Sequence, residues 1–114
     1  MKIINHTELQ ARIASNVSLA LLEALPEKYY RDGHLPGAIL FPHDQVKQLA
    51  PALLHDKEAE IVVYCASATC QNSHIAAKQL IALGYGNVAV YAGGKKEWSE
   101  AGLVFEKNED KISA

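Results

Sequence analysis

One cysteine in the sequence stands where a thiol is both held in place and activated. Cys65 directly follows four β-favouring residues, 61–64 (IVVY), and opens a polar loop that runs to Gln71. A stretch with helical spacing of its apolar residues begins just after this loop. The free N–H groups and the positive dipole end of such a helix would lower the pKa of the Cys65 thiol and stabilise a thiolate. They would equally stabilise the terminal sulfur of a persulfide, which is also an anion.

The predicted anion-binding loop carries a second thiol. Its members are Ala66, Ser67, Ala68, Thr69, Cys70 and Gln71. If the loop curls back, Cys70 could resolve a persulfide or a sulfenic acid on Cys65 by forming a disulfide. Two plainer interpretations stay open, in which Cys65 is a buried structural cysteine and Cys70 only lines the loop. A zinc site formed by both cysteines and His74 lacks a fourth ligand and has no common metal spacing, so no metal is predicted.

Short apolar runs that alternate with helical stretches must position this loop. Four runs are predicted as strands, residues 17–22, 38–41, 61–64 and 88–91. Strands that alternate with helices indicate a parallel sheet in an α/β fold, and such sheets place their sites at the carboxyl ends of the strands.

Helical spacing and capping residues predict the stretches between the strands. The first helix is capped by Thr7, and a short second helix opens at Pro26. A third helix starts at Asp44 and kinks or breaks in two at Pro51. A fourth is capped by Asn72 or Ser73 and ends at Gly84, and a final helix covers residues 95–101. The helix before Gly84 is expected to bury Ile75, Ala76, Gln79, Leu80 and Leu83 on one face.

Composition indicates one globular domain. Of 114 residues, 49% are hydrophobic and 21% charged, which excludes general disorder and fits a domain over residues 1–105 with a frayed charged tail over 106–114. Eleven basic and 13 acidic residues give a net charge of −2, which excludes an electrostatic footprint for nucleic acid or an anionic membrane. The apolar stretches are too short to span a bilayer and no signal-peptide apolar region opens the chain, which predicts a cytoplasmic location.

Several stretches, taken in order, resemble the signature of rhodanese-like domains. Residues 33–39 (GHLPGAI) resemble that family's loop and strand, and residues 61–65 (IVVYC) resemble the strand that leads into its catalytic cysteine. The pattern continues with residues 76–80 (AAKQL), 83–85 (LGY), 87–88 (NV), 93–94 (GG) and Trp98. The match extends from about Leu9 to Leu103. It implies a five-stranded parallel sheet with helices on both faces, in which Cys65 accepts sulfane sulfur as a persulfide.

Three departures from the family pattern bear on the substrate. The family's Asp-Val-Arg motif corresponds here to residues 22–25 (LEAL), in which Glu23 supplies a carboxylate and no arginine follows. The stretch from Cys65 to Gly84 is longer than in a typical single-domain member. No Arg or Lys occurs between Cys65 and His74. Without a cation on the loop, phosphoryl transfer is disfavoured and free thiosulfate is expected to be a poor sulfur donor.

The residues and the resemblance together predict a sulfurtransferase that needs no cofactor. Cys65 would take sulfane sulfur from a small donor and pass it to cyanide, a small thiol or a protein thiol. The alternative is a non-enzymatic rhodanese-like module that binds a partner or senses redox state through Cys65 and Cys70. Lys95 and Lys96 either lend positive potential to the pocket or stay solvated, and His34 is expected to be a hydrogen-bonded structural residue.

Overall fold

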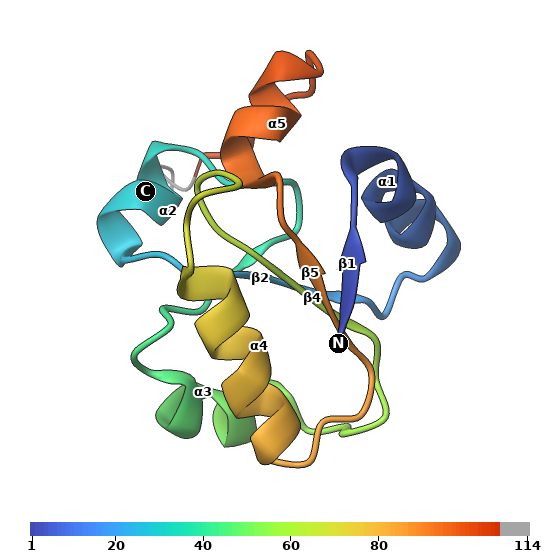
Figure 1. The fold of residues 1–114 in the computed structure, drawn as a ribbon, viewed down its shortest axis with the longest axis vertical. Helices are drawn as coiled ribbons and strands as arrows, with labels where there is room; N and C mark the ends of the chain where they lie inside the picture. Colours follow the sequence, from blue (N-terminus) through green and yellow to red (C-terminus); the bar gives the residue numbers. More distant parts are fainter. Residues whose placement is uncertain (108–114) are drawn as a thin grey trace, which may run out of the picture.

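The computed structural model describes residues 1–107, in which five parallel strands form one central sheet (Figure 1). The strands are β1 (Lys2–Ile4), β2 (Ala20–Glu23), β3 (Ile39–Leu40), β4 (Ile61–Tyr64) and β5 (Val88–Tyr91). Their order across the sheet is β1-β5-β4-β2-β3. In register, Val63 of β4 lies opposite Leu22 of β2 and Val90 of β5. The carboxyl end of β4, which Cys65 follows, is therefore flanked by a strand on each side.

Helices cover both faces of this sheet. Within the described residues they are α1 (His6–Ser15), α2 (Glu27–Asp32), α3 (Val46–Leu53), α4 (Asn72–Ala82) and α5 (Gly94–Glu100). Figure 1 shows α3 next to α4 and apart from α1 and α5. The predicted α/β fold, a five-stranded parallel sheet with helices on both faces, is confirmed.

Two hydrophobic cores follow from the alternation of side chains along the central strand. Ile61 and Val63 pack with aliphatic side chains of α3 and α4 on one face. Val62 and Tyr64 pack with Leu9 of α1 and Trp98 of α5 on the other face. All four side chains are fully buried, as expected for a parallel strand covered on both sides. Burial of each such side chain contributes about 1.5–3 kcal/mol to the free energy of folding. This burial fixes the position of β4 and so of the first residue of the loop that follows it.

Two strands differ from the sequence prediction. The strand β1 was not predicted, and it exists because it pairs with β5 at the edge of the sheet. The predicted strand 17–22 begins only at Ala20, because Asn16 accepts hydrogen bonds from the backbone N–H groups of Ser18 and Leu19 and so forms a turn. Val17 is consequently fully exposed, which makes its assignment to a buried strand wrong.

The helix ends also correct the prediction. Asn5, not Thr7, caps α1, and its side chain and that of Glu8 form a reciprocal capping box. One helix, α3, runs through Pro51 where a break into two was considered. Gln71 is the N-cap residue of α4, so Asn72 and Ser73 lie inside the helix.

The face of α4 that meets the sheet was only partly predicted. Ala76 and Leu80 are buried as expected, but the Ile75 side chain is 39% exposed. Ser73 is buried in its place.

The end of the described chain is tied to the loop before β3. Glu106 and His34 exchange two backbone hydrogen bonds of 2.8 Å, and the Glu106 carboxylate accepts a third from the N–H of Gly37. Of the tail predicted over residues 106–114, Glu106 thus contacts the domain, and residues 108–114 lie outside the described residues.

Among residues 1–107, no helix has both the length and the apolar character that crossing a membrane requires.

Candidate active site

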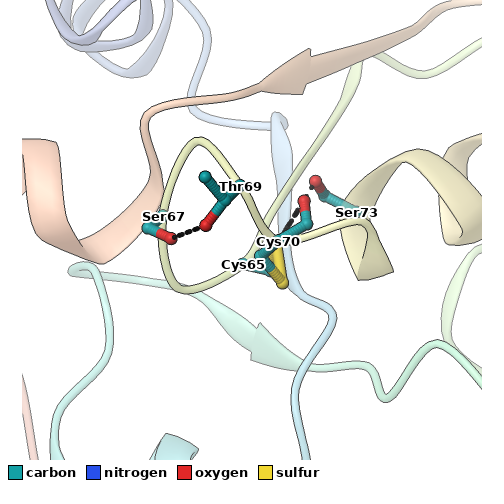
Figure 2. Close-up of a disulfide and its surroundings, with 5 residues drawn as sticks. All are labelled: Cys65, Ser67, Thr69, Cys70 and Ser73. Carbon is teal, nitrogen blue, oxygen red and sulfur yellow. Dashed lines mark hydrogen bonds between the residues drawn. A yellow bond between two sulfur atoms is a disulfide. The ribbon is translucent and has the colours of Figure 1, made fainter.

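The structure places Cys65 at the carboxyl end of the central strand, as the sequence predicts. Cys65 is only 1% exposed. The chain then turns outward through residues 66–71 before α4 begins at Asn72. Figure 2 shows this loop curling back on itself, so that Cys70 returns to Cys65. The positive dipole end of α4 faces the same point, because the helix starts directly after the loop.

The two cysteines are joined by a disulfide. Their Cα atoms lie 6.3 Å apart, within the range that a disulfide spans. A turn in which the N–H of Cys70 donates to the carbonyl of Ser67 closes the loop at 3.1 Å. Cys65 is buried whereas Cys70 is half-buried, so Cys70 is the more accessible of the two. The loop therefore curls back, which is the condition under which Cys70 was expected to meet Cys65.

Ser73 is a site residue that the sequence interpretation missed. Its side chain is buried, and its hydroxyl lies 3.5 Å from Cys65 Sγ (Figure 2). When Cys65 is reduced, this hydroxyl can donate a hydrogen bond to the thiolate. The signal was available, because Ser73 precedes the buried Ala76, Ala77 and Leu80 by three, four and seven positions and so shares their helix face.

Two carbonyl groups at the start of the loop bond to α5, whereas the Cys70 carbonyl oxygen lies 3.4 Å from Cys65 Sγ. The carbonyls of Cys65 and Ala66 accept hydrogen bonds from the N–H groups of Lys95 and Lys96 in the first turn of α5, at 3.0 and 2.9 Å. Gly94 allows this approach: its φ is +64°, and a Cβ there would collide with the Cys65 carbonyl.

The N–H groups of the same loop remain largely free. Within residues 1–107, five of them have no hydrogen-bond partner, those of Ala66, Ser67, Ala68, Thr69 and Gln71. Unpaired donors grouped beside a helix N-terminus favour an anion over a neutral ligand. The predicted anion-binding loop thus has the donors that it would need.

The side chains of the loop are small and uncharged. Ala66, Ala68 and Thr69 are exposed, and Ser67 and Thr69 place their hydroxyl oxygens 3.2 Å apart (Figure 2). The only positive contribution from the loop and the start of α4 is therefore that of backbone dipoles.

A buried ionic network lies beside the loop. The Lys95 ammonium is 2.9 Å from one carboxylate oxygen of the fully buried Glu23, and it also donates to the Tyr29 carbonyl at 2.7 Å. The Tyr64 hydroxyl donates to the other oxygen of Glu23 at 2.6 Å and accepts from the N–H of Leu35 at 3.1 Å. Burial and the Glu23 carboxylate raise the pKa of Tyr64 far above its ordinary value.

The two lysines at the start of α5 have different environments. Lys95 neither stays solvated nor offers a free charge to the loop, because Glu23 neutralises it. Lys96 is solvated, with a side chain that is 69% exposed and 3.9 Å from Glu100. The sequence interpretation noted the Glu23 carboxylate but not its partner, since nothing local links two residues so far apart in the chain.

In the described part of the chain, neither His34 nor His74 has a hydrogen bond to Cys65 or Cys70. His34 is buried, its Nδ1 donates to the Tyr30 carbonyl at 3.0 Å, and its ring stacks on that of Tyr30 at 3.9 Å. It is therefore a structural residue, as expected. His74 is half-buried on the first turn of α4. Among residues 1–107, no three His, Cys, Asp or Glu side chains gather as a metal site would require.

Comparison with known proteins gives one relative by sequence and many by fold. The sequence is 36% identical over 86 residues to the adenylyltransferase and sulfurtransferase UBA4 of Candida albicans, a match that covers 70% of this chain and 19% of that protein. The chain thus spans about a fifth of the length of this relative. The fold is similar to the thiosulfate sulfurtransferase of Pseudomonas aeruginosa (TM-score 0.80, 25% identity, 96% of this chain and 21% of that one).

A solved domain of nearly the same extent is also similar. The rhodanese-like domain of the Alr3790 protein from Anabaena has a TM-score of 0.83 at 24% identity, with 100% of this chain and 86% of that chain covered, which supports the fold. The sequence model of the rhodanese-like domain matches residues 5–101. With most of its length matched and the five-stranded fold in place, the chain belongs to the rhodanese-like domain family.

Proposed function

We propose that the protein is a sulfurtransferase in which Cys65 carries sulfane sulfur as a persulfide. The observation that carries this proposal is the position of Cys65 at the end of β4, where it opens a loop with unpaired N–H groups that leads directly into the N-terminus of α4. A thiolate and a persulfide are both anions, so the same donors stabilise the nucleophile and its product. The sulfurtransferase names of the Candida albicans and Pseudomonas aeruginosa relatives support the same chemistry.

The reaction starts from the reduced form, because a disulfide holds no nucleophile. The Cys65 thiolate attacks the outer sulfur of the donor, whose S–S bond breaks, and the leaving group departs with the electron pair. The new persulfide places its terminal sulfur among the free N–H groups. An acceptor nucleophile then attacks that terminal sulfur, and Cys65 leaves as the thiolate. Cyanide, a small thiol and a protein thiol are the proposed acceptors.

The charge of the loop favours certain donors over others. A persulfide of a small or a protein thiol needs no strong cationic partner. Thiosulfate carries two charges. Of the two lysines whose N–H groups contact the loop, Lys95 is already paired with Glu23, and Lys96 is solvated beside Glu100. Persulfides are accordingly the proposed donors, with thiosulfate as a weak substitute.

Intact mass spectrometry tests this function directly. The protein is reduced, desalted without oxygen and exposed to a small-thiol persulfide. The Cys70→Ser variant should gain one sulfur atom that cyanide removes as thiocyanate, and the Cys65→Ser variant should gain none. A Cys70→Ser protein that folds but takes up no cyanide-labile sulfur would contradict the proposal.

The Cys65–Cys70 disulfide favours a second candidate, a redox-sensing module without catalysis. Such a module would form and lose the disulfide but would not accept sulfur on Cys65. The same mass measurement separates the two candidates, because only the sulfurtransferase loads sulfur in the Cys70→Ser variant.

A further inference from the structure

We propose that Cys70 resolves the Cys65 persulfide and releases its outer sulfur as hydrosulfide, which makes the domain a dithiol-driven persulfide reductase. This activity rests on the proposed function, because it needs sulfur on Cys65. It goes beyond transfer to an acceptor, since the sulfur leaves in a reduced form and the protein itself supplies the electrons.

The geometry of the two thiols carries the proposal. In the structure Cys70 Sγ is bonded to Cys65 Sγ, across a Cα separation of 6.3 Å. In a persulfide on Cys65, that Sγ is the inner sulfur. Cys70 is therefore held against the inner sulfur, and attack there gives the disulfide that the structure contains. The turn in which the Cys70 N–H donates to the Ser67 carbonyl at 3.1 Å holds Cys70 on the side of Cys65.

The step balances within the chain. The Cys70 thiol gives its proton to the outer sulfur of the anionic persulfide, and the Cys70 sulfur forms a bond to Cys65 Sγ. The bond between Cys65 Sγ and the outer sulfur breaks, and the outer sulfur takes the electron pair and leaves as hydrosulfide. The sulfane sulfur gains two electrons, and the two cysteines lose them as they form the disulfide. Proximity favours this route, because a nucleophile in the same loop acts at a high effective concentration.

The difference in exposure between the cysteines determines how the site is reset. A dithiol reductant from solution meets the half-buried Cys70 before the 1%-exposed Cys65. Attack on the Cys70 sulfur expels Cys65 as a thiolate, which the loop N–H groups and the Ser73 hydroxyl stabilise. The second thiol of the reductant then displaces Cys70 and becomes part of a disulfide. The nucleophile is thus regenerated in its reactive state.

A single-turnover experiment without added reductant tests this activity. Reduced, desalted wild-type protein and the Cys70→Ser variant each receive one equivalent of a small-thiol persulfide under nitrogen. Free sulfide is trapped with a bimane reagent, and peptide mapping locates disulfide and bound sulfur. Wild type should release close to one sulfide per chain and form the Cys65–Cys70 disulfide. Cys70→Ser should keep its sulfur on Cys65 and release about tenfold less sulfide.

The other outcomes separate this activity from the proposed function. If wild type retains cyanide-labile sulfur as fully as Cys70→Ser does, or if the sulfur is found on Cys70, resolution by Cys70 is refuted while sulfur loading stands. If neither Cys70→Ser nor the smaller change Cys70→Ala loads sulfur although both fold, the proposed function itself fails, and the reductase activity fails with it. The small thiol released by the donor is present in every arm, so it does not account for a difference between them.

Discussion

Lys95 and Glu23 form a buried ion pair next to the cysteine loop, with 2.9 Å between Nζ and Oε2. Glu23 is fully buried, and the Lys95 side chain is 17% exposed. The same lysine holds the loop through its backbone, because its N–H donates to the Cys65 carbonyl. Lys95 thereby links the end of β2, through Glu23, to the start of the cysteine loop.

Removal of the Lys95 charge should destabilise the fold. Lys95→Met leaves the Glu23 carboxylate buried without its counter-charge, which costs about 3 kcal/mol of unfolding free energy. Lys96→Met is the matched control, since its exposed ammonium contributes less than about 0.5 kcal/mol. Urea denaturation measures both. Adding Glu23→Gln to Lys95→Met should recover part of the loss, and a Lys95→Met protein as stable as Lys96→Met would show that the pair is unimportant.

Tyr64 should make the fold sensitive to alkali. Burial and the neighbouring Glu23 raise the pKa of Tyr64 above its ordinary value of about 10, so the folded state keeps a proton that the unfolded chain loses. The contribution of Tyr64 to stability is therefore complete below about pH 10 and falls as the pH rises, by about 1.4 kcal/mol per pH unit. Tyr64→Phe loses two hydrogen bonds and is less stable near neutrality, but it lacks this slope. Urea denaturation between about pH 8 and pH 11 should show the two proteins converging, whereas parallel curves would contradict the assignment.

The Ser73 hydroxyl should assist the Cys65 thiolate. Ser73→Ala removes a donor 3.5 Å from Cys65 Sγ, and a hydrogen bond to a charged group contributes about 1.5–3 kcal/mol. In reduced protein carrying Cys70→Ser, alkylation of Cys65 near neutral pH should slow by about tenfold, or about 1.4 kcal/mol. His74→Ala, one position along the same helix turn, should alkylate at the unchanged rate. Equal rates in the two variants would remove Ser73 from the site.

A cation placed on the loop should change the choice of donor. Thr69 is exposed, and Thr69→Arg adds a positive charge where thiosulfate must approach. The apparent KM for thiosulfate should fall by about tenfold with a smaller change in kcat, because the charge acts on binding. Thr69→Gln controls for side-chain size. Should wild type already saturate at low thiosulfate concentration, the loop must obtain positive potential from another source.

Gly94 should be essential to the position of the loop. At φ +64° any Cβ is strained, and a Cβ here would also collide with the Cys65 carbonyl and lie 2.9 Å from the carbonyl carbon of Ala66. Gly94→Ala should therefore cost about 2 kcal/mol of stability and reduce sulfur loading on Cys65. Gly86→Ala, with no heavy atom within 4 Å of the added Cβ, should change neither. Thermal unfolding and the mass assay measure the two effects.

The parts of the fold that the sequence predicts well are those fixed by local pattern. β4 and β5 are runs of β-favouring residues buried on both faces, and their bounds match the prediction. β1 could not be predicted in this way, because only Ile4 of its three residues is buried and the strand exists through pairing with β5. The start of β2 was misplaced because the Asn16 turn takes Val17 out of the sheet.

The candidate site shows the same division. Local order along the chain was enough to place Cys65 at a strand end and to identify its loop. Whether that loop brings Cys70 back to Cys65 was left open, because it depends on the turn that the loop makes. The contact of Lys95 with Glu23 depends on how α5 packs against β2, which no local pattern encodes. Ser73 was within reach of sequence reasoning, but its polar side chain suggested a helix cap rather than a buried partner for the thiolate.

The short span between the two cysteines has a consequence for how the protein tolerates a change of redox state. A disulfide stabilises mainly by restricting the unfolded chain, and the restriction grows with the length of the ring that it closes. The ring here spans a sequence separation of five, so opening it costs only about 2 kcal/mol. The sheet and its two cores do not depend on that ring. Oxidised and reduced chains therefore share one native topology, and thiol–disulfide exchange at the loop proceeds without global unfolding.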